Sequence, residues 1–161
     1  MNVFITGASS GIGEALAREF AARGARLGLA ARRTEALQTL AAALPGNHLV
    51  YGVDVTNTDA IVATGHAFDE AVGGADIVIA NAGISVGVKT EYYEDLAQFR
   101  RVFETNVFSM SATFHPFIAR MKARQRGALV GIASVAGIRG LPGSEAYCAS
   151  KAAVIIDAQS M

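Results

Sequence analysis

TGASSGIG, residues 6–13, contains three glycines in eight positions, between the apolar run Val3–Ile5 and a helix-like run that starts at Glu14. Glycine has no side chain, so a glycine-rich backbone can approach a ligand closely. The first turn of a helix presents unpaired N–H groups and a partial positive charge. A glycine-rich turn between a strand and a helix therefore predicts a site for a phosphate group.

The residues of this turn have separate expected roles. Gly7 would let the chain turn sharply, while Gly11 and Gly13 would bring a pyrophosphate and the next strand close to the helix. Ser9 and Ser10 could donate further hydrogen bonds. The spacing is G-x-x-x-G-x-G, not the G-x-G-x-x-G of many dinucleotide folds, and by itself it also fits a bare tight turn.

The composition favours one domain with a buried sheet. The chain has 161 residues, 52% of them hydrophobic and 17% charged, which suffices for one compact domain with a core. No apolar run reaches the roughly 20 residues that span a bilayer. The net charge is zero and Lys and Arg are scattered, so neither a membrane nor nucleic acid is an expected partner. The single cysteine, and a first strand directly after Met1 that leaves no room for a signal peptide, predict a cytoplasmic protein.

Short apolar runs alternate with longer amphipathic stretches along the chain. The runs predict strands at residues 2–6, 26–31, 48–53, 75–80 and 128–133. The stretches predict helices at 12–22, 34–44, 58–72 and 95–124, and a last helix from Ser144. Because this alternation is typical of βαβ units, we expect an α/β fold. It would be a Rossmann-like, doubly wound parallel sheet with helices on both faces.

The last helix and the fifth strand both indicate further structure. The alanine-rich helical signal from Glu145 continues without a Gly, Asn or Pro stop signal. The fifth strand is almost wholly apolar, yet it would form an edge of the sheet, which a neighbouring strand normally covers. We therefore expect residues 1–161 to be a single dinucleotide-binding and catalytic domain that lacks its C-terminal strands.

The ends of the other strands favour a phosphorylated dinucleotide. After the second strand an acidic residue would bind the ribose 2′-hydroxyl of NAD, whereas an arginine accepts the 2′-phosphate of NADP. The sequence has Arg32 and Arg33 there and no acidic residue before Glu35, which predicts NADP in preference to NAD. One of the two arginines could equally be a solvated residue at the start of a helix. Asp54 could accept from the adenine amino group, and Asn81–Gly83 would let the cofactor lie against backbone, although such residues are also common in caps and turns.

Three residues near the C-terminus suit carbonyl chemistry. Tyr147 and Lys151 have i, i+4 spacing, which places both on one face of a helix. A phenol ionises at about pH 10, and a neighbouring ammonium lowers that pKa toward the range where general acid–base catalysis works best. Ser134, at the end of the fifth strand, could orient the substrate oxygen. A Tyr–Lys pair alone is common on ordinary helices, so the signal comes from its combination with the serine and the nucleotide pattern.

TGASSGIG, the NAG turn at 81–83, Ser134 and YCASK at 147–151 together resemble the short-chain dehydrogenase/reductase family, in its form with a T-G-x-x-x-G-x-G turn. The resemblance covers essentially the whole chain. It implies a catalytic tetrad of Asn106, Ser134, Tyr147 and Lys151. Tyr147 would exchange the proton, and Lys151 would bind the nicotinamide ribose and lower the tyrosine pKa. Ser134 would polarise the carbonyl, and Asn106 would hold a water in a proton relay.

The resemblance also implies a cofactor, a substrate class and an assembly. A hydride would pass between NADP(H) and a small carbonyl or secondary alcohol. Relatives pair the long helix and the Tyr/Lys helix across a two-fold axis, so a homodimer or homotetramer is expected. The expected cofactor contacts are Gly7, Ser9, Ser10, Gly11, Ile12, Gly13, Arg32, Arg33, Asp54, Val55, Asn81, Ala82, Gly83, Tyr147 and Lys151.

The sequence departs from the family after the Tyr/Lys helix. Family members continue into two more strands and a variable substrate lid, and the first added strand ends in a Pro-Gly turn against the nicotinamide. Pro142–Gly143 precedes Tyr147 and so does not supply that turn. The departure leaves the activity of residues 1–161 alone an open question.

Other reactive side chains have plainer explanations. Cys148, beside Tyr147, is expected to be a buried and inert thiol. The three histidines His48, His66 and His115 are widely spaced and lack partner ligands, so no metal site is predicted. Pro116 would kink the long helix or begin a new segment within it.

Three hypotheses about function follow. The first is an NADP-dependent carbonyl reductase or alcohol dehydrogenase with Tyr147 as general acid and base. The second is a catalytically silent nucleotide-binding module that senses cofactor or serves as a scaffold. The third is a fragment that does not fold. The complete tetrad favours the first, and the absent C-terminal elements favour the others.

Overall fold

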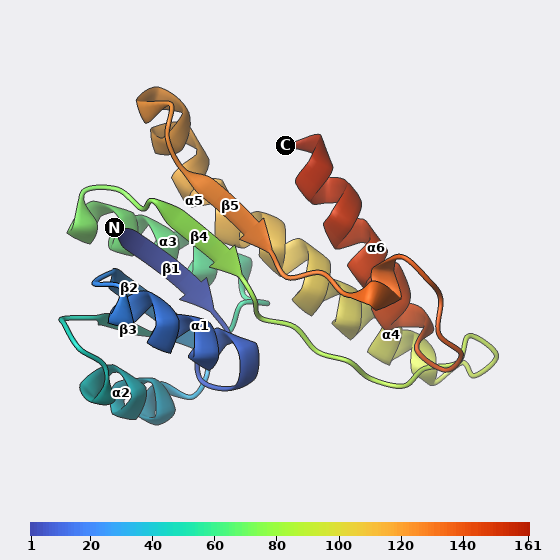
Figure 1. Cartoon of the computed structure of the whole chain (residues 1–161). Helices are drawn as coiled ribbons and strands as arrows, with labels where there is room; N and C mark the ends of the chain where they lie inside the picture. Colours follow the sequence, from blue (N-terminus) through green and yellow to red (C-terminus); the bar gives the residue numbers. More distant parts are fainter.

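Five parallel strands form one sheet in the order β3-β2-β1-β4-β5 (Figure 1). The computed structural model describes all of residues 1–161. The strands are β1 (Asn2–Thr6), β2 (Arg26–Ala31), β3 (Leu49–Gly52), β4 (Ile77–Ala80) and β5 (Ala128–Gly131). The order reverses at β1, so the carboxyl ends of β1 and β4 flank the crevice where doubly wound sheets bind ligands. The predicted fold class is therefore confirmed.

Two strands begin later than predicted, and side chains make hydrogen bonds just before each of them. His48 precedes β3, where its Nδ1 accepts a hydrogen bond from the Leu27 backbone N–H at 3.2 Å. Ala75 precedes β4, and its N–H donates to the buried Asp69 carboxylate at 2.7 Å. The first bond joins residues 21 apart and the second joins residues six apart, and neither belongs to the strand ladder.

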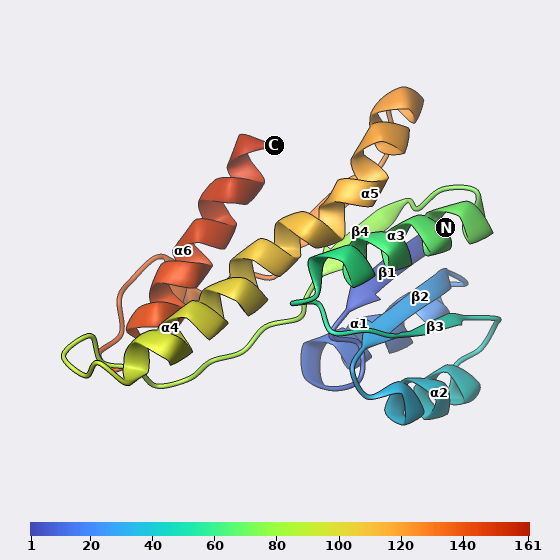
Figure 2. The same cartoon turned by 180° about the vertical axis from the view of Figure 1, so that it is seen from behind.

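Helices cover both faces of the sheet (Figures 1 and 2). One face carries α1 (Gly11–Ala22) and α2 (Thr34–Ala43), and the opposite face carries α3 (Thr58–Val72) and α5 (Ser109–Arg124). Of the remaining helices, α4 (Asp95–Phe103) lies beyond the carboxyl ends of the strands and packs against α6 (Glu145–Ser160). Val154 of α6 also belongs to the core cluster on the α3 and α5 face. None of the helices has both the length and the apolarity required to cross a membrane.

The predicted helix over 95–124 is one helical stretch with a bulge. A π-helical turn, Glu104–Phe108, joins α4 to α5. Pro116 begins no segment; it lies buried inside α5, against Gly65 of α3. The irregularity falls at the π turn because the side chain of Asn106 there is held by two other parts of the fold.

The strands divide the core into two layers. Val3 and Ile5 of β1 face α1 and α2, while Phe4 points to the α3 and α5 side. This alternation follows from the two-residue period of a strand. The Phe4 ring lies 5.3 Å from that of Phe68 and 5.4 Å from that of Phe117, centroid to centroid. Aromatic packing therefore fixes the distance of α3 and α5 from the sheet.

The fifth strand lies at one edge of the sheet. It pairs only with β4, and its residues Ala128 and Val130 are exposed. A parallel edge with apolar residues is unusual, because parallel strands are normally covered on both faces and sides.

Gly28 of β2 is required by the aromatic layer. A Cβ at this position would lie 2.5 Å from Phe68 Cδ2 and 2.8 Å from Phe4 Cδ2. We predict that Gly28→Ala lowers the free energy of unfolding by about 1–3 kcal/mol, the usual cost of overpacking a core. The measurement is urea unfolding. Gly140→Ala is the control, because a Cβ there meets nothing within 4 Å; equal destabilisation by both changes would contradict the prediction.

Candidate cofactor and catalytic site

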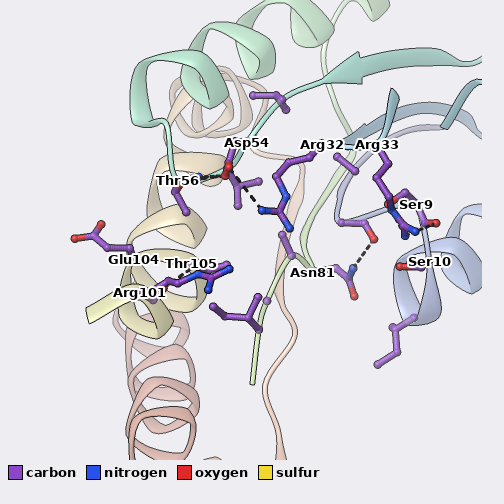
Figure 3. Close-up of a pocket in the computed structure, with 18 of the residues that line it drawn as sticks. Ser9, Ser10, Arg32, Arg33, Asp54, Thr56, Asn81, Arg101, Glu104 and Thr105 are labelled. Carbon is purple, nitrogen blue, oxygen red and sulfur yellow. Dashed lines mark hydrogen bonds and ion pairs between the residues drawn. The ribbon is translucent and has the colours of Figure 1, made fainter. Parts of the chain in front are cut away.

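An open cavity of about 740 Å³ lies at the carboxyl ends of the strands (Figure 3). Most of the residues predicted to contact a cofactor line it. They are Gly7, Ser9, Ser10, Ile12, Arg32, Arg33, Asp54, Val55, Asn81, Ala82 and Gly83. Of the remaining predicted contacts, Gly11 and Gly13 lie in the same turn and helix, and Tyr147 and Lys151 lie on α6 outside the lining.

The glycine-rich turn needs its glycines for two different reasons. Gly7 and Gly11 have φ angles of 65° and 58°, in the left-handed region that side chains disfavour. Gly13 instead lacks space, because a Cβ there would lie 2.4 Å from the Gly7 carbonyl oxygen. The first turn of α1 therefore approaches β1 closely while its N-terminus remains open to the cavity.

The amide of Asn81 fastens this turn to the end of β4. Its Nδ2 donates to the carbonyl oxygens of Thr6, at 3.0 Å, and Gly7, at 3.3 Å. The Thr6 hydroxyl oxygen in turn accepts from the backbone N–H groups of Asn81 and Ala82. The Asn81 side chain thus supports the turn, and the small residues after it leave backbone facing the cavity.

The two arginines after β2 have different partners (Figure 3). Arg33 reaches back to the turn, where one Nη donates to the backbone oxygen and hydroxyl of Ser9 at 3.1 and 3.2 Å. Arg32 extends across the cavity, with its Nη1 3.9 Å from Asp54 Oδ2. Both members of that pair are well exposed, so the ion pair contributes little to stability. Arg32 is therefore the more available of the two for a ligand.

Asp54 is a fixed acceptor. Its Oδ1 accepts from the Thr56 backbone N–H at 3.0 Å and from the Thr56 hydroxyl at 2.8 Å. The backbone hydrogen bond from Thr56 is the main cause that lowers the pKa of Asp54. Burial acts in the opposite direction, and the Thr56 hydroxyl, Arg32 and Arg101 add to the lowering. The carboxylate is therefore ionised at neutral pH.

The wall opposite the strands comes from α4 and the π turn, and sequence reasoning missed it. It consists of Ala97, Arg100, Arg101, Glu104 and Thr105. The i, i+4 relations within this set place them on one helix face. That spacing was the available signal, but nothing in it says which face meets the cavity.

Asn106 of the π turn connects three segments of the site. It is buried, and its Oδ1 accepts from the Ile84 N–H at 2.8 Å. Its Nδ2 donates to the Ile84 carbonyl at 2.9 Å and to the Ser150 hydroxyl at 3.0 Å. Ser150 in turn donates to the Tyr147 backbone oxygen at 2.8 Å. Both amide hydrogens of Asn106 are used in fixing the β4–α4 connection to α6.

Tyr147 and Lys151 lie on one face of α6, as their spacing predicts. Lys151 Nζ is 5.8 Å from the centroid of the Tyr147 ring and donates to the Ile132 carbonyl at 2.6 Å. The lysine is 5% exposed and forms no ion pair. Its burial lowers its pKa from the ordinary value. Tyr147 is half-buried.

Ser134 lies on the loop that follows β5, and this loop packs on the same helix. The Ser134 hydroxyl accepts from the Ala136 N–H at 3.2 Å and so begins a 3₁₀ turn, Val135–Gly137. A Cβ at Gly137 would lie 2.7 Å from the Lys151 backbone. No hydrogen bond joins Ser134 to Tyr147. The loop that carries Ser134 and the residue Tyr147 are related only through α6, on which that loop packs.

Gly83 is the point where the cavity meets these residues. It lines the cavity, and a Cβ there would lie 3.2 Å from Asn106 Oδ1 and 3.6 Å from Lys151 Nζ. A ligand that reaches Gly83 from the glycine-rich turn would therefore come close to the lysine. This arrangement can bind a long anionic ligand at one end and exchange a proton at the other.

Two side-chain types outside this set are accounted for. Cys148 is buried, as predicted, and its Sγ accepts from the Leu141 N–H at 3.2 Å. No three residues of His, Cys, Asp and Glu lie together in a way that could hold a metal ion.

Comparison with known proteins places this geometry in a family. The sequence model of the short chain dehydrogenase family matches residues 1–161. An uncharacterized oxidoreductase of Myxococcus xanthus is 42% identical over 92% of this chain and 59% of its own length. The NADPH-dependent pterin aldehyde reductase of Arabidopsis thaliana is 36% identical over 94% of this chain and 64% of its own length.

A solved structure shows the same fold. The crystal structure of a short-chain dehydrogenase from Streptomyces avermitilis superposes with a TM-score of 0.92 and 32% identity, over 99% of this chain and 59% of that one. The chain thus spans about three fifths of the length of these relatives. With a family match along its whole length, the chain belongs to the short-chain dehydrogenase family.

Proposed function

We propose that this chain forms the cofactor-binding and catalytic part of an oxidoreductase that interconverts a carbonyl and a secondary alcohol with NADP(H). The position of Gly83 carries the proposal: Gly83 lines the same cavity as the glycine-rich turn, and it also lies close to Asn106 and Lys151. The name of the Arabidopsis relative, an NADPH-dependent aldehyde reductase, supports the same chemistry.

A dinucleotide would lie along the cavity. The N–H groups of the first turn of α1 and the hydroxyls of Ser9 and Ser10 would hold the pyrophosphate, since side chains are absent at Gly7 and Gly11. The ionised Asp54 would accept from the adenine amino group. Arg32 would donate to a 2′-phosphate, because its guanidinium is exposed and only loosely paired.

The residues on α6 and its neighbours would handle the proton. A bound nicotinamide supplies or takes the hydride. The Tyr147 hydroxyl would give its proton to the substrate oxygen in reduction and take it back in oxidation. Lys151 would favour the ionised phenol through its positive charge, and Ser134 would hold the substrate oxygen by a hydrogen bond. Asn106 would position Ile84 and Ser150, because its two amide hydrogens are donated to them. A water in a proton relay could therefore only donate a hydrogen bond to the Asn106 Oδ1 atom.

The domain and its assembly are further parts of the proposal. We infer that residues 1–161 are one domain of a cytoplasmic enzyme and that further strands pair with β5. The exposed apolar residues of that edge support this inference, as does the greater length of the relatives. Phe108 and Ile156 are exposed by 60% and 61%, which supports a homodimer or homotetramer through this region.

Replacing the tyrosine tests the catalytic role. We predict that Tyr147→Phe lowers kcat for NADPH-dependent reduction of a carbonyl panel by at least about a hundredfold, because general acid catalysis is lost. Binding of NADPH should change little, measured by the fluorescence of the bound cofactor. A wild-type protein that binds NADPH and turns over no carbonyl or alcohol would instead favour a silent sensor or scaffold. Unchanged kcat in Tyr147→Phe would contradict the proposal.

The two arginines test cofactor choice. We predict that Arg32→Ala weakens NADPH binding about tenfold, the value of one charge-assisted hydrogen bond, and leaves NADH binding nearly unchanged. Arg33→Ala should weaken both cofactors, because Arg33 also holds Ser9 of the turn. Arg23→Ala, an exposed arginine outside the cavity, is the control. Equal losses for NADPH and NADH in Arg32→Ala would be incompatible with recognition of the 2′-phosphate.

A further inference from the structure

The connection from β4 to α4, residues 81–94, passes beside the N-terminal end of α6. Figures 1 and 2 both show this yellow-green segment next to the start of the red helix. The Val88 N–H donates to the Gly143 carbonyl at 3.2 Å, and Val88 pairs with Ser144 as an isolated parallel bridge. Two residues later, the Thr90 N–H donates to Glu145 Oε2 at 2.7 Å, and the Thr90 hydroxyl donates to the same oxygen.

We propose that this Thr90–Glu145 clasp holds residues 84–88 against α6 beside Tyr147, and that Glu145 is a positioning residue for substrate. The inference rests on the proposed function, since it concerns the substrate side of the same site. It concerns a contact between two exposed side chains that lie outside the cofactor cavity.

The segment from Ile84 to Thr90 is fixed at both of its ends. At Ile84 the Asn106 amide binds both the N–H and the carbonyl. At Thr90 the Glu145 carboxylate accepts both donors. Between these points Val88 packs in a small buried cluster with Ala146 and Val102. Without the clasp, the Val88 contacts and the hydrogen bond from the Lys89 N–H to the Asp95 carboxylate would still hold the far end of the segment, but neither would bind it to the Glu145 side chain.

Contacts near each end of the segment connect it to the part of α6 that carries Tyr147. Ala146, which Val88 covers, immediately precedes Tyr147 in α6. At the other end, Asn106 is linked through Ser150 to the Tyr147 backbone oxygen. A shift of the segment would therefore be transmitted to α6 at Ala146 and Ser150, on both sides of Tyr147 in the sequence. A substrate would lie beside the Tyr147 hydroxyl if that residue gives it a proton, so its binding would respond to such a shift.

The charges around Glu145 suit an acceptor. The hydrogen bond from the Thr90 hydroxyl, followed by that from the Thr90 N–H, lowers the pKa of Glu145; Lys89 adds a smaller lowering, and burial and Asp95 act in the opposite direction. These two neighbours have other partners: Lys89 Nζ lies 3.7 Å from Glu91 Oε1, and Asp95 Oδ2 accepts a hydrogen bond from the Lys89 backbone N–H at 2.8 Å. Glu145 also lies in the first turn of α6, where a negative charge is favoured. It therefore remains a carboxylate at neutral pH and can accept both Thr90 donors.

The test compares Glu145→Ala, Thr90→Val and the double variant in the complete protein. We expect Glu145→Ala to raise KM for a carbonyl substrate roughly three- to tenfold, equivalent to about one hydrogen bond, with the Kd of NADPH unchanged. The double variant should be no worse than Glu145→Ala, because both changes break one contact. Glu145→Gln, which keeps an oxygen acceptor, should recover part of the loss. Glu94→Ala is the matched control, since Glu94 is exposed in the same connection and makes no side-chain hydrogen bond at its helix end.

Hydrogen exchange gives a second readout that needs no turnover. The Val88 amide should exchange faster in Glu145→Ala than in wild type, while amides of α1 keep their rates. An unchanged substrate KM, an equal rise in the Kd of NADPH, fully additive single effects or an unchanged Val88 exchange rate would each overturn the clasp. Absence of turnover in wild type would overturn the proposed function instead, and the exchange rates would then decide alone whether the clasp holds the segment.

Discussion

The structure depends on the close approach of β1, the first turn of α1 and the end of β4. Gly13 leaves no space for a side chain against the Gly7 carbonyl, and Asn81 binds the carbonyls of Thr6 and Gly7. This packing leaves the N–H groups at the start of α1 facing a cavity and not a side chain. It also fixes where the chain leaves β4, so the next residues, including Gly83, start from a rigid point.

From that point the chain runs through the rest of the site. Gly83 lies beside Asn106 and Lys151, Ile84 is held by the Asn106 amide, and the connection continues to α6. The glycine-rich turn and α6, which carries Tyr147 and Lys151, come from opposite ends of the sequence. The short segment that follows β4 contacts both of them. The proposed cofactor site and the residues proposed to transfer the proton are in this way tied to one another by covalent geometry as well as by packing.

Local signals made most of the fold predictable. The bounds of α3 match the prediction, because Asn57 caps its start by accepting from the Ala60 N–H and Gly73, with a φ of 71°, ends it. The glycine-rich turn and the Tyr147–Lys151 pair on α6 were also predictable, because the spacing of their residues in the sequence is enough to identify them. The π turn could not be predicted in the same way, since residues 95–124 are compatible with a helix throughout. Its position depends on the contacts of Asn106 with Ile84 and Ser150, which only the tertiary structure brings together.

The central claim is that one cleft receives both the pyrophosphate and the reacting groups. A crystal structure with NADP⁺ bound tests it most directly. The account predicts pyrophosphate oxygens about 3 Å from backbone N–H groups of the first turn of α1. It also predicts the nicotinamide ring beside Gly83, with its reactive carbon facing the Tyr147 hydroxyl. A cofactor bound with its adenine at Gly83, or with its nicotinamide far from Tyr147, would contradict the account.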